Sequence, residues 1–217
     1  CLEIGAGRGT KTYVMMCQAK RAGYDRQHTA LDLHDRKCDQ NLARLHKAGI
    51  TGVRTVSGDA CELDTVLTSF DAMLGKPVLF DTVFIDAPCS GTGTLRRHPE
   101  IPWRLTEKDV TTELPKLQLM MLKEAAARVA EDGELIYATC SVFDEENTQV
   151  VDAFLVSPEG ADFTVAPLSE AQILQLPEFE QAKQLISVRQ NDRGLFQSVP
   201  VNADSYDGHF CARLVRK

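Results

Sequence analysis

Short apolar runs alternate with amphipathic, helix-like stretches along most of this chain, and this alternation constrains the fold more than any other feature. Strands are predicted at 2–4, 29–33, 53–57, 82–86 and 135–139, and helices at 12–22, 36–48, 117–130 and 145–155. A βαβα order predicts an α/β, Rossmann-like fold with helices on both faces of a mostly parallel sheet. Two late runs, 195–201 and 210–215, flank a polar turn at 204–208 and predict an antiparallel edge at the C-terminal end.

Length and composition predict one domain that spans residues 1–217. A chain of 217 residues with 43% hydrophobic side chains is long enough for one core of ordinary size. No apolar run approaches the roughly 20 residues that cross a bilayer, so a soluble, cytoplasmic protein is expected. The chain opens on Cys1 rather than on methionine, and its first strand begins at once, which predicts an N-terminally truncated domain.

The cysteines and the net charge exclude some classes of protein. The seven cysteines lie far apart and form no Cys-x-x-Cys pair, so neither a disulfide framework nor a metal site is expected. The net charge of −7 argues against a nucleic-acid partner, because phosphate binding draws on basic surfaces. Arg96, Arg97 and His98 are a local basic exception to that charge.

A glycine-rich segment joins the first predicted strand to the first predicted helix. Its residues are Gly5, Ala6, Gly7, Arg8, Gly9, Thr10 and Lys11. A dinucleotide-binding loop would need its third glycine one place later, whereas a P-loop would need only glycine in place of Thr10 and stays open as an alternative. The segment also suits S-adenosylmethionine, which carries adenosine but no pyrophosphate. Asp32, after the second strand, would then accept hydrogen bonds from the ribose hydroxyls.

Two thiols stand at the ends of neighbouring predicted strands. Cys89 follows Asp86 by three residues, and Cys140 directly follows the strand at 135–139. Since parallel strands end at one edge of a sheet, these groups are expected to converge there, with Asp59 at the same edge. A thiolate at Cys140 that adds to carbon 6 of cytosine would make carbon 5 nucleophilic, while Asp86 holds the base and Cys89 assists release. The alternative is that both cysteines are buried hydrophobes.

Two long segments resemble the signature motifs of Sun (Fmu)-type RNA cytosine-C5 methyltransferases. They are DAPCSGTGTLRRHPEIPW at 86–103 and YATCSVFDEEN at 137–147, and the closing DGHFCARL at 207–214 is also similar, so that the likeness covers nearly the whole chain. The glycine loop departs from the usual family sequence, because Arg8 stands in place of a proline and Thr10 in place of a glycine.

The resemblance implies specific roles for the residues already singled out. Cys140 is then the nucleophile, Cys89 the thiol that helps product release, and Asp86 a contact to the base and the cofactor. Gly5 to Lys11, Asp32 and Asp59 are then the S-adenosylmethionine site. The family acts on ribosomal or transfer RNA, with the ribosomal enzymes the better match, and an upstream RNA-binding region is expected to be missing from this chain.

The remaining expectations concern the surface. Arg96, Arg97 and His98 are candidates for RNA contacts, although pairing with acids such as Glu100 would explain them equally well. Trp103 could stack on a base, but a lone tryptophan after a proline is expected to be a packing anchor. Glu145, Glu146 and Asn147 are expected to orient a loop near Cys140, unless the two acids simply favour a helix dipole. A catalytically inactive RNA-binding module and a P-loop-like NTPase remain as alternative functions.

Overall fold

The computed structural model describes residues 1–202 and 206–217 and divides them into two compact units. Unit 1 holds residues 1–86 and 124–135, and unit 2 holds residues 87–123 and 136–217. Helix α5 (Leu114–Ala126) and strand β5 (Val129–Thr139) contribute to both. In the described part of the chain, no helix has the length and apolar character needed to span a bilayer.

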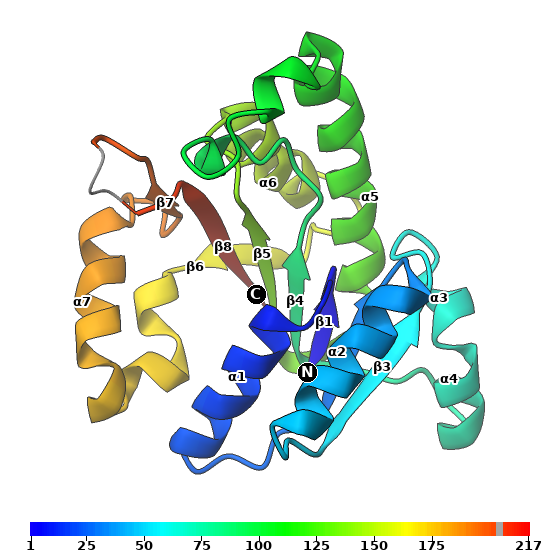
Figure 1. Cartoon of the computed structure of the whole chain (residues 1–217). Coiled ribbons are helices and arrows are strands. Elements are labelled where there is room, and N and C mark those ends of the chain that lie inside the picture. Colours follow the sequence, from blue (N-terminus) through cyan, green and yellow to red (C-terminus); the bar gives the residue numbers. More distant parts are fainter. Residues whose placement is uncertain (203–205) are drawn as a thin grey trace. The chain divides into compact units, whose positions relative to one another are not determined.

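Unit 1 is built from alternating strands and helices (Figure 1). Its strands are β1 (Leu2–Ile4), β2 (His28–Asp32), β3 (Val53–Ser57) and β4 (Phe80–Asp86), and its helices are α1 (Thr10–Arg21), α2 (Asp35–Lys47), α3 (Leu63–Val66) and α4 (Thr68–Leu74). The strand order is β3-β2-β1-β4, and every pairing between β1, β2, β3 and β4 that is resolved is parallel. The side chains of β1, including Leu2 and Ile4, are fully buried.

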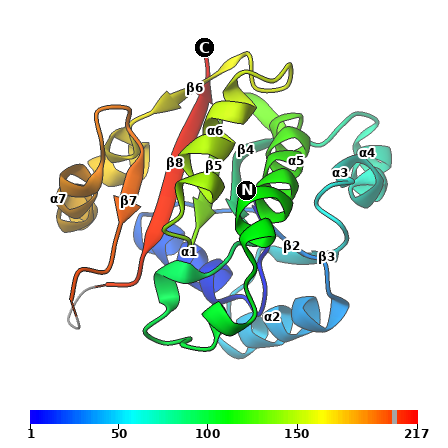
Figure 2. The ribbon, with the colours of Figure 1, turned by 90° about the horizontal axis from the view of Figure 1, so that it is seen from above.

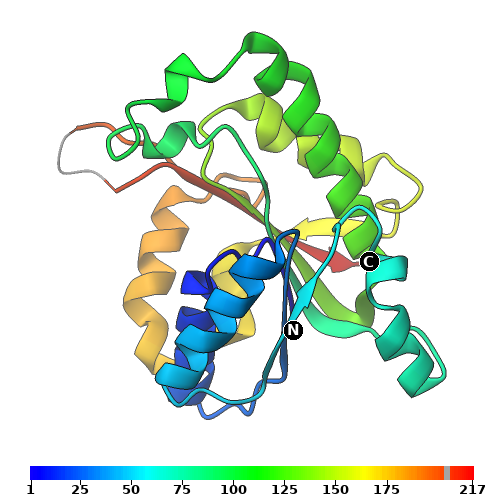
Figure 3. The ribbon, with the colours of Figure 1, turned by 45° about the vertical axis from the view of Figure 1, so that its right-hand side comes forward.

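The strand order also explains where the helices of unit 1 lie. The chain steps from β1 through β2 to β3 in one direction, so right-handed crossovers place α1 and α2 on the same face. It then returns past β1 to β4, which places the α3–α4 crossover on the opposite face (Figure 3). The predicted Rossmann-like sheet with helices on both faces is therefore confirmed, and the reversal creates a switch point between β1 and β4.

Unit 2 carries the antiparallel part of the fold. Strands β6 (Phe163–Ala166) and β7 (Phe196–Ser198) both pair antiparallel with β8 (His209–Arg216). Helices α6 (Thr148–Leu155) and α7 (Glu180–Arg189) lie among these elements (Figure 2). Short helical segments lie at Thr92–Thr94, Ile101–Trp103, Asp109–Glu113, Asp144–Glu146, Leu168–Glu170, Gln172–Gln175 and Pro177–Phe179. Tyr137 and Phe210 pack edge to face in the core, with ring centroids 6.2 Å apart.

Several element boundaries predicted from the sequence are wrong. Helix α5 ends at Ala126 rather than 130, and β5 begins at Val129, so Gly133 lies inside a strand instead of ending a helix. A Cβ at Gly133 would lie 3.0 Å from the carbonyl oxygen of Asp81, which shows why this strand position takes a glycine.

Smaller differences occur elsewhere. Asp35 is the first residue of α2 rather than its N-cap, and the strand predicted at 195–201 is reduced to β7. The turn predicted at 204–208 includes residues 204 and 205, which lie outside the described residues. Strand β6 and helices α3, α4 and α7 were not predicted, because none has a clear apolar period.

Candidate active site

The backbone register of unit 1 brings the predicted cofactor residues to one level. Ile4 pairs with Leu31 on β2 and with Ile85 on β4. The residues that follow these three in the chain are Gly5, Asp32 and Asp86. They therefore lie side by side at the carboxyl edge of the parallel strands. Gly5 and Asp86 flank the switch point between β1 and β4, where open α/β sheets bind their ligands.

The glycines of the loop are required by its backbone. Gly5, Gly7 and Gly9 all have positive φ, at 80°, 57° and 80°. A Cβ at Gly5 would lie 2.4 Å from the carbonyl oxygen of Asp86, and one at Gly9 would lie 1.9 Å from Oδ1 of Asn41. At Gly7 the nearest such atom is 4.0 Å away, so the backbone there is open to a ligand.

Asp32 fixes the shape of this loop. Its Oδ2 accepts a hydrogen bond of 2.9 Å from the backbone N–H of Gly7, and its Oδ1 accepts one of 3.0 Å from His34. Lys37 Nζ lies 3.4 Å from the same Oδ1. The Asp32 side chain is buried and turned toward the glycine loop, and a carboxylate with two oxygens has acceptor capacity left for a ribose hydroxyl.

The other predicted cofactor residues have local partners. Lys11 Nζ forms an ion pair of 2.5 Å with Oδ2 of Asp86, so that the loop and the end of β4 hold opposite charges in contact. Arg44 donates a hydrogen bond of 2.8 Å to Thr10, which replaces the family glycine. Asp59 is exposed and accepts a hydrogen bond of 2.8 Å from the backbone of Cys61, which is the turn role that any aspartate there can play.

A buried polar group behind the loop was missed by the sequence analysis. Glu3 on β1 is fully buried, and its Oε2 accepts hydrogen bonds from Thr12 at 2.6 Å and from His28 at 2.8 Å. Asn41 on α2 donates to the Thr12 hydroxyl at 3.1 Å. These bonds fix the first turn of α1, and with it the end of the glycine loop. In the sequence, the only sign of this buried group is that Glu3 is a charged residue inside an apolar strand.

In unit 2 the two predicted thiols are in contact. The sulfur atoms of Cys89 and Cys140 are 3.3 Å apart, and the backbone N–H of Cys140 lies 3.3 Å from the Cys89 sulfur. The hydrogen bond to Cys140 and burial raise the pKa of the Cys89 thiol. Two sulfurs this close do not ionise together, so one of the two thiols keeps its proton when the other becomes a thiolate.

A buried hydrogen-bond network, here called the Glu146 network, holds the two cysteine loops together. Glu146 is fully buried and accepts hydrogen bonds from the Ser90 backbone at 2.7 Å and the Ser90 hydroxyl at 2.5 Å. Gln118 donates to it at 3.2 Å and to the carbonyl of Pro88 at 2.9 Å. The Ser90 hydroxyl also lies 3.1 Å from that of Ser141, so the serine after each cysteine joins one loop to the other.

Glu146 therefore does more than favour a helix dipole, and its burial decides between the two roles left open by the sequence. Asn147 belongs to the same arrangement, because it accepts a hydrogen bond from Thr139 at 2.6 Å and donates one to the Ser141 carbonyl at 3.0 Å. The sequence signal that was missed is the repeated Cys-Ser pair, at 89–90 and 140–141.

The basic residues predicted to touch RNA are paired with acids on the surface of unit 2. Asp207 contacts Arg97 at 2.5 Å and Arg96 at 3.5 Å, and the hydrogen bond from Arg97 lowers the pKa of that carboxyl. His98 lies 3.3 Å from Glu100, as the pairing alternative predicted. Arg96, Arg97 and His98 all keep about half of their side-chain surface exposed, so they remain accessible to a ligand.

The prediction for Trp103 is wrong. This side chain is 89% exposed on the short helical turn Ile101–Trp103 and packs into no core. Among the residues that the structure describes, no group of three or more His, Cys, Asp or Glu is arranged to hold a metal ion.

The chain is similar to known proteins over nearly its whole length. The model of the 16S rRNA methyltransferase RsmB/F family matches residues 1–214. The ribosomal RNA small subunit methyltransferase B of Klebsiella pneumoniae (strain 342) is 42% identical over 173 residues, which cover 79% of this chain and 37% of that protein. The chain thus spans only a part of the length of such curated relatives, between 27% and 37% for the first two.

Two solved structures share the fold. The crystal structure of PH0851 matches with a TM-score of 0.76 and 26% identity, over 99% of this chain and 42% of that one. The crystal structure of NSun6 from Pyrococcus horikoshii with SFG matches with a TM-score of 0.73 and 18% identity, over 99% of this chain and 47% of that one. The Rossmann-like methyltransferase fold predicted from the sequence is confirmed by both.

Proposed function

The chain belongs to the 16S rRNA methyltransferase RsmB/F family, and on that basis we propose that it transfers a methyl group from S-adenosylmethionine to carbon 5 of a cytosine in ribosomal RNA. The whole chain, 1–217, then serves this catalytic function in the cytoplasm, where ribosomal RNA is found. Membership of a methyltransferase family also sets aside the P-loop NTPase and the dinucleotide-binding alternatives. The contact between the sulfurs of Cys89 and Cys140 is the observation that carries the chemistry.

Unit 1 holds the proposed site for the cofactor. The positive-φ glycines of residues 5–9 open the backbone at Gly7, and Asp32 presents a buried carboxylate at the same level. These residues fit the adenosine part of S-adenosylmethionine, with Asp32 toward the ribose. Asp59 and Lys11 complete the proposed set. When bound, the cofactor supplies the methyl group as an electrophile attached to a sulfonium.

We assign the nucleophile to Cys140. Its thiolate adds to carbon 6 of the cytosine, which breaks the aromaticity of the ring and gives carbon 5 the electron pair that attacks the methyl group. The hydrogen bond to Cys140 and burial raise the pKa of the Cys89 thiol, so we assign to Cys89 the protonated role beside that nucleophile. Asp86, next to the proposed cofactor residues and three residues before Cys89, is assigned to the base edge.

Cys89 then completes the reaction. The largest cause of its raised pKa is the hydrogen bond to Cys140, and that cause weakens once the Cys140 sulfur is bonded to carbon 6 and carries no charge. Cys89 can then ionise and take the proton from carbon 5. The electrons of that C–H bond restore the ring double bond and expel Cys140 as a thiolate, which returns the pair to its starting state.

The test uses the full-length protein, S-adenosylmethionine and small-subunit ribosomal RNA that lacks the modification. Cys89→Ala is expected to accumulate a covalent protein–RNA adduct on a denaturing gel, because the carbon 5 proton is no longer removed. Cys140→Ala and the double variant are expected to form none. An adduct with transfer RNA instead would redirect the substrate assignment.

Two results would count against the proposal. If Cys140→Ala still methylates RNA at the normal rate, then Cys140 is not the nucleophile. If the unmodified protein binds this RNA but neither methylates it nor forms an adduct as Cys89→Ala, then the chain is an inactive RNA-binding module.

A further inference from the structure

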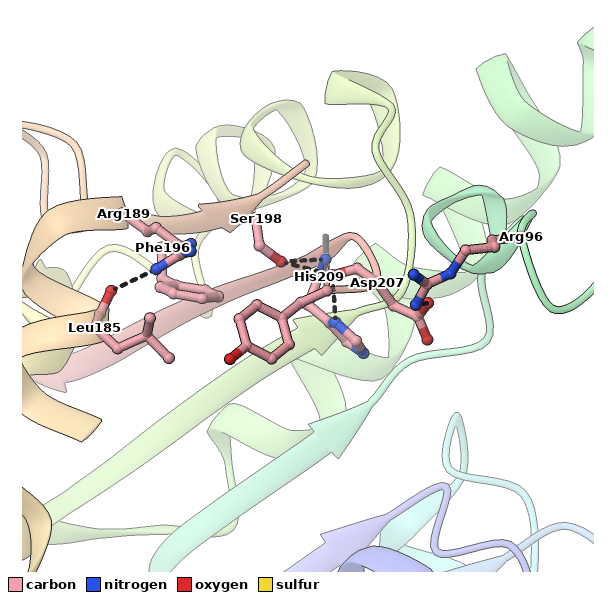
Figure 4. A pocket seen from close by; sticks show the side chains of 8 residues that line it. Arg96, Leu185, Arg189, Phe196, Ser198, Asp207 and His209 are labelled. Carbon is pink, nitrogen blue, oxygen red and sulfur yellow. Dashed lines mark hydrogen bonds and ion pairs between the residues drawn. The ribbon is translucent and has the colours of Figure 1, made fainter. Parts of the chain in front are cut away.

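A cavity on unit 2 lies outside the residues assigned to catalysis. It has a volume of about 600 Å³ and is lined by Arg96, Leu185, Arg189, Phe196, Ser198, Tyr206, Asp207 and His209. Figure 4 shows Leu185 and Arg189 at one end, Arg96 at the other, and Ser198 and His209 between them. We propose that this cavity binds a nucleotide of the RNA substrate beside the target cytosine, an inference that rests on the proposed function.

The chemistry of the lining suits a nucleotide. Tyr206 is 71% exposed, and the guanidinium carbon of Arg189 lies 6.0 Å from the centre of its ring, so an aromatic face and a cation are presented together. Phe196 adds a second aromatic ring. Bases stack on such rings whatever their sequence, and guanidinium groups bind phosphates.

The charge of the lining also favours an anion. Arg96 and Arg189 are cations in a chain whose net charge is −7, and Asp207 is the acid among the lining residues. That acid is occupied by Arg97 at 2.5 Å, and its side chain is only 12% exposed. Asp207 also pairs with Arg96 at 3.5 Å, so a phosphate entering the cavity would meet the guanidinium of Arg189 and the exposed half of Arg96 rather than a bare carboxylate.

Main-chain hydrogen bonds connect the cavity wall to the proposed nucleophile through Gly93. The N–H of Gly93 donates to the carbonyl of Cys140 at 2.9 Å, and the N–H of Gly208 donates to the carbonyl of Gly93 at 2.8 Å. Gly208 stands between Asp207 and His209, which both line the cavity. Gly93 and Gly208 thus connect the lining residues Asp207 and His209 to the Cys140 backbone.

These two glycines are in tight contact. A Cβ at Gly93 would lie 2.1 Å from the carbonyl oxygen of Gly208, so this close approach of the two backbones requires a glycine there. The closing Asp-Gly-His segment, which the catalytic chemistry leaves unused, therefore joins the cavity to the cysteine loops. An RNA strand whose cytosine reaches Cys140 would have its neighbouring nucleotide at this wall.

The experiment measures binding and methylation of unmodified small-subunit ribosomal RNA by the full-length protein over a range of KCl concentrations. Tyr206→Ala is expected to weaken RNA binding by about 5- to 150-fold, the range found for loss of one base–aromatic stack. Arg189→Ala is expected to lower the slope of log Kd against log salt by about one phosphate contact. Arg193→Ala is the matched control, because Arg193 is half exposed, pairs with Asp152 and does not line the cavity.

The outcomes separate this inference from the proposed function. Methylation by the unmodified protein, with normal RNA affinity and salt slope in both cavity variants, would overturn the cavity assignment alone. Weakened RNA binding by the two variants would support it even if no methylation were seen, since binding is measured independently of catalysis. A photo-crosslink from 4-thiouridine in the RNA to the peptide that contains Tyr206 would locate the contact directly.

Discussion

Replacement of Glu146 by glutamine should separate folding from catalysis. The two carboxylate oxygens receive donors from the Ser90 backbone, the Ser90 hydroxyl and Gln118, with no exposure to water. Hydrogen bonds to a charged group contribute about 1.5–3 kcal/mol each. Glu146→Ala would lose both short bonds from Ser90, at a cost of about 3–6 kcal/mol, and would unfold many domains of ordinary stability.

Glu146→Gln keeps the volume and one acceptor, so it should cost only about 1.5–3 kcal/mol and leave the protein folded. Its amide NH2 either opposes the Ser90 backbone N–H or requires the Ser90 hydroxyl to accept instead of donate and to give its own proton to Ser141 or Thr92. Either arrangement changes the bonds that hold the loop with Cys89. Because a misplacement of about 1 Å can lower a rate by about 100-fold, kcat for methyl transfer should fall by that order. The affinity for S-adenosylmethionine should not change, since the proposed cofactor residues make no bond to Glu146.

The assay is single-turnover methyl transfer with unmodified ribosomal RNA, at a temperature well below the unfolding midpoint of each variant. Glu145→Gln, the same change one residue earlier at a half-buried position, is the matched control. Unchanged kcat in Glu146→Gln with a lowered unfolding midpoint would show that Glu146 only stabilises the fold. Loss of cofactor affinity would refute the reasoning in another way, because the effect would then not be local to the cysteine loops.

Two further predictions concern unit 1. Gly9→Ala should lower the free energy of unfolding, measured in urea, at least twice as much as Gly75→Ala. Both glycines have positive φ, which costs an alanine about 1–2 kcal/mol, but only at Gly9 would the new Cβ overlap Asn41. Equal effects of the two changes would show that the Asn41 side chain moves aside without cost. The hydrogen bond from Arg128 lowers the pKa of Asp71, so this pair stabilises the fold above about pH 4 and its contribution is lost as pH falls through the folded-state value. Unfolding midpoints from pH 3 to 7 should therefore depend less on pH in Arg128→Met, and an unchanged dependence would contradict the assignment.

The order of elements and the location of the chemistry followed from local sequence. Apolar runs of strand length that alternate with helical periods leave few arrangements other than a parallel sheet with crossover helices. Glycines at 5, 7 and 9 are needed because the loop has positive φ there, which is a property of the backbone itself. Gly5, Asp32 and Asp86 follow three parallel strands and lie side by side because the ends of parallel strands meet at one edge.

Side-chain partners were beyond the reach of sequence, and Trp103 and Glu146 show why. Average behaviour of the residue type made Trp103 a packing anchor and left Glu146 between a loop-orienting role and a helix dipole, yet Trp103 is 89% exposed and Glu146 is fully buried. Burial is decided by which segments fold over a residue, and those segments are distant in the chain: Gln118 and Ser90 reach Glu146 from 28 and 56 residues away.

The sequence by itself determined the fold class, the glycine loop and the positions of the two cysteines. The reason is that the order of elements along the chain, the backbone conformation of a loop and the identity of a residue are local or nearly local properties. Only the tertiary structure decided that Cys89 and Cys140 touch, that Glu146 fixes their loops, and that Gly93 and Gly208 join those loops to a cavity. Contacts between atoms depend on how distant segments pack. The distances of 2.5–3.3 Å in these contacts require defined positions of both partners, and a pattern of residue types does not specify those positions.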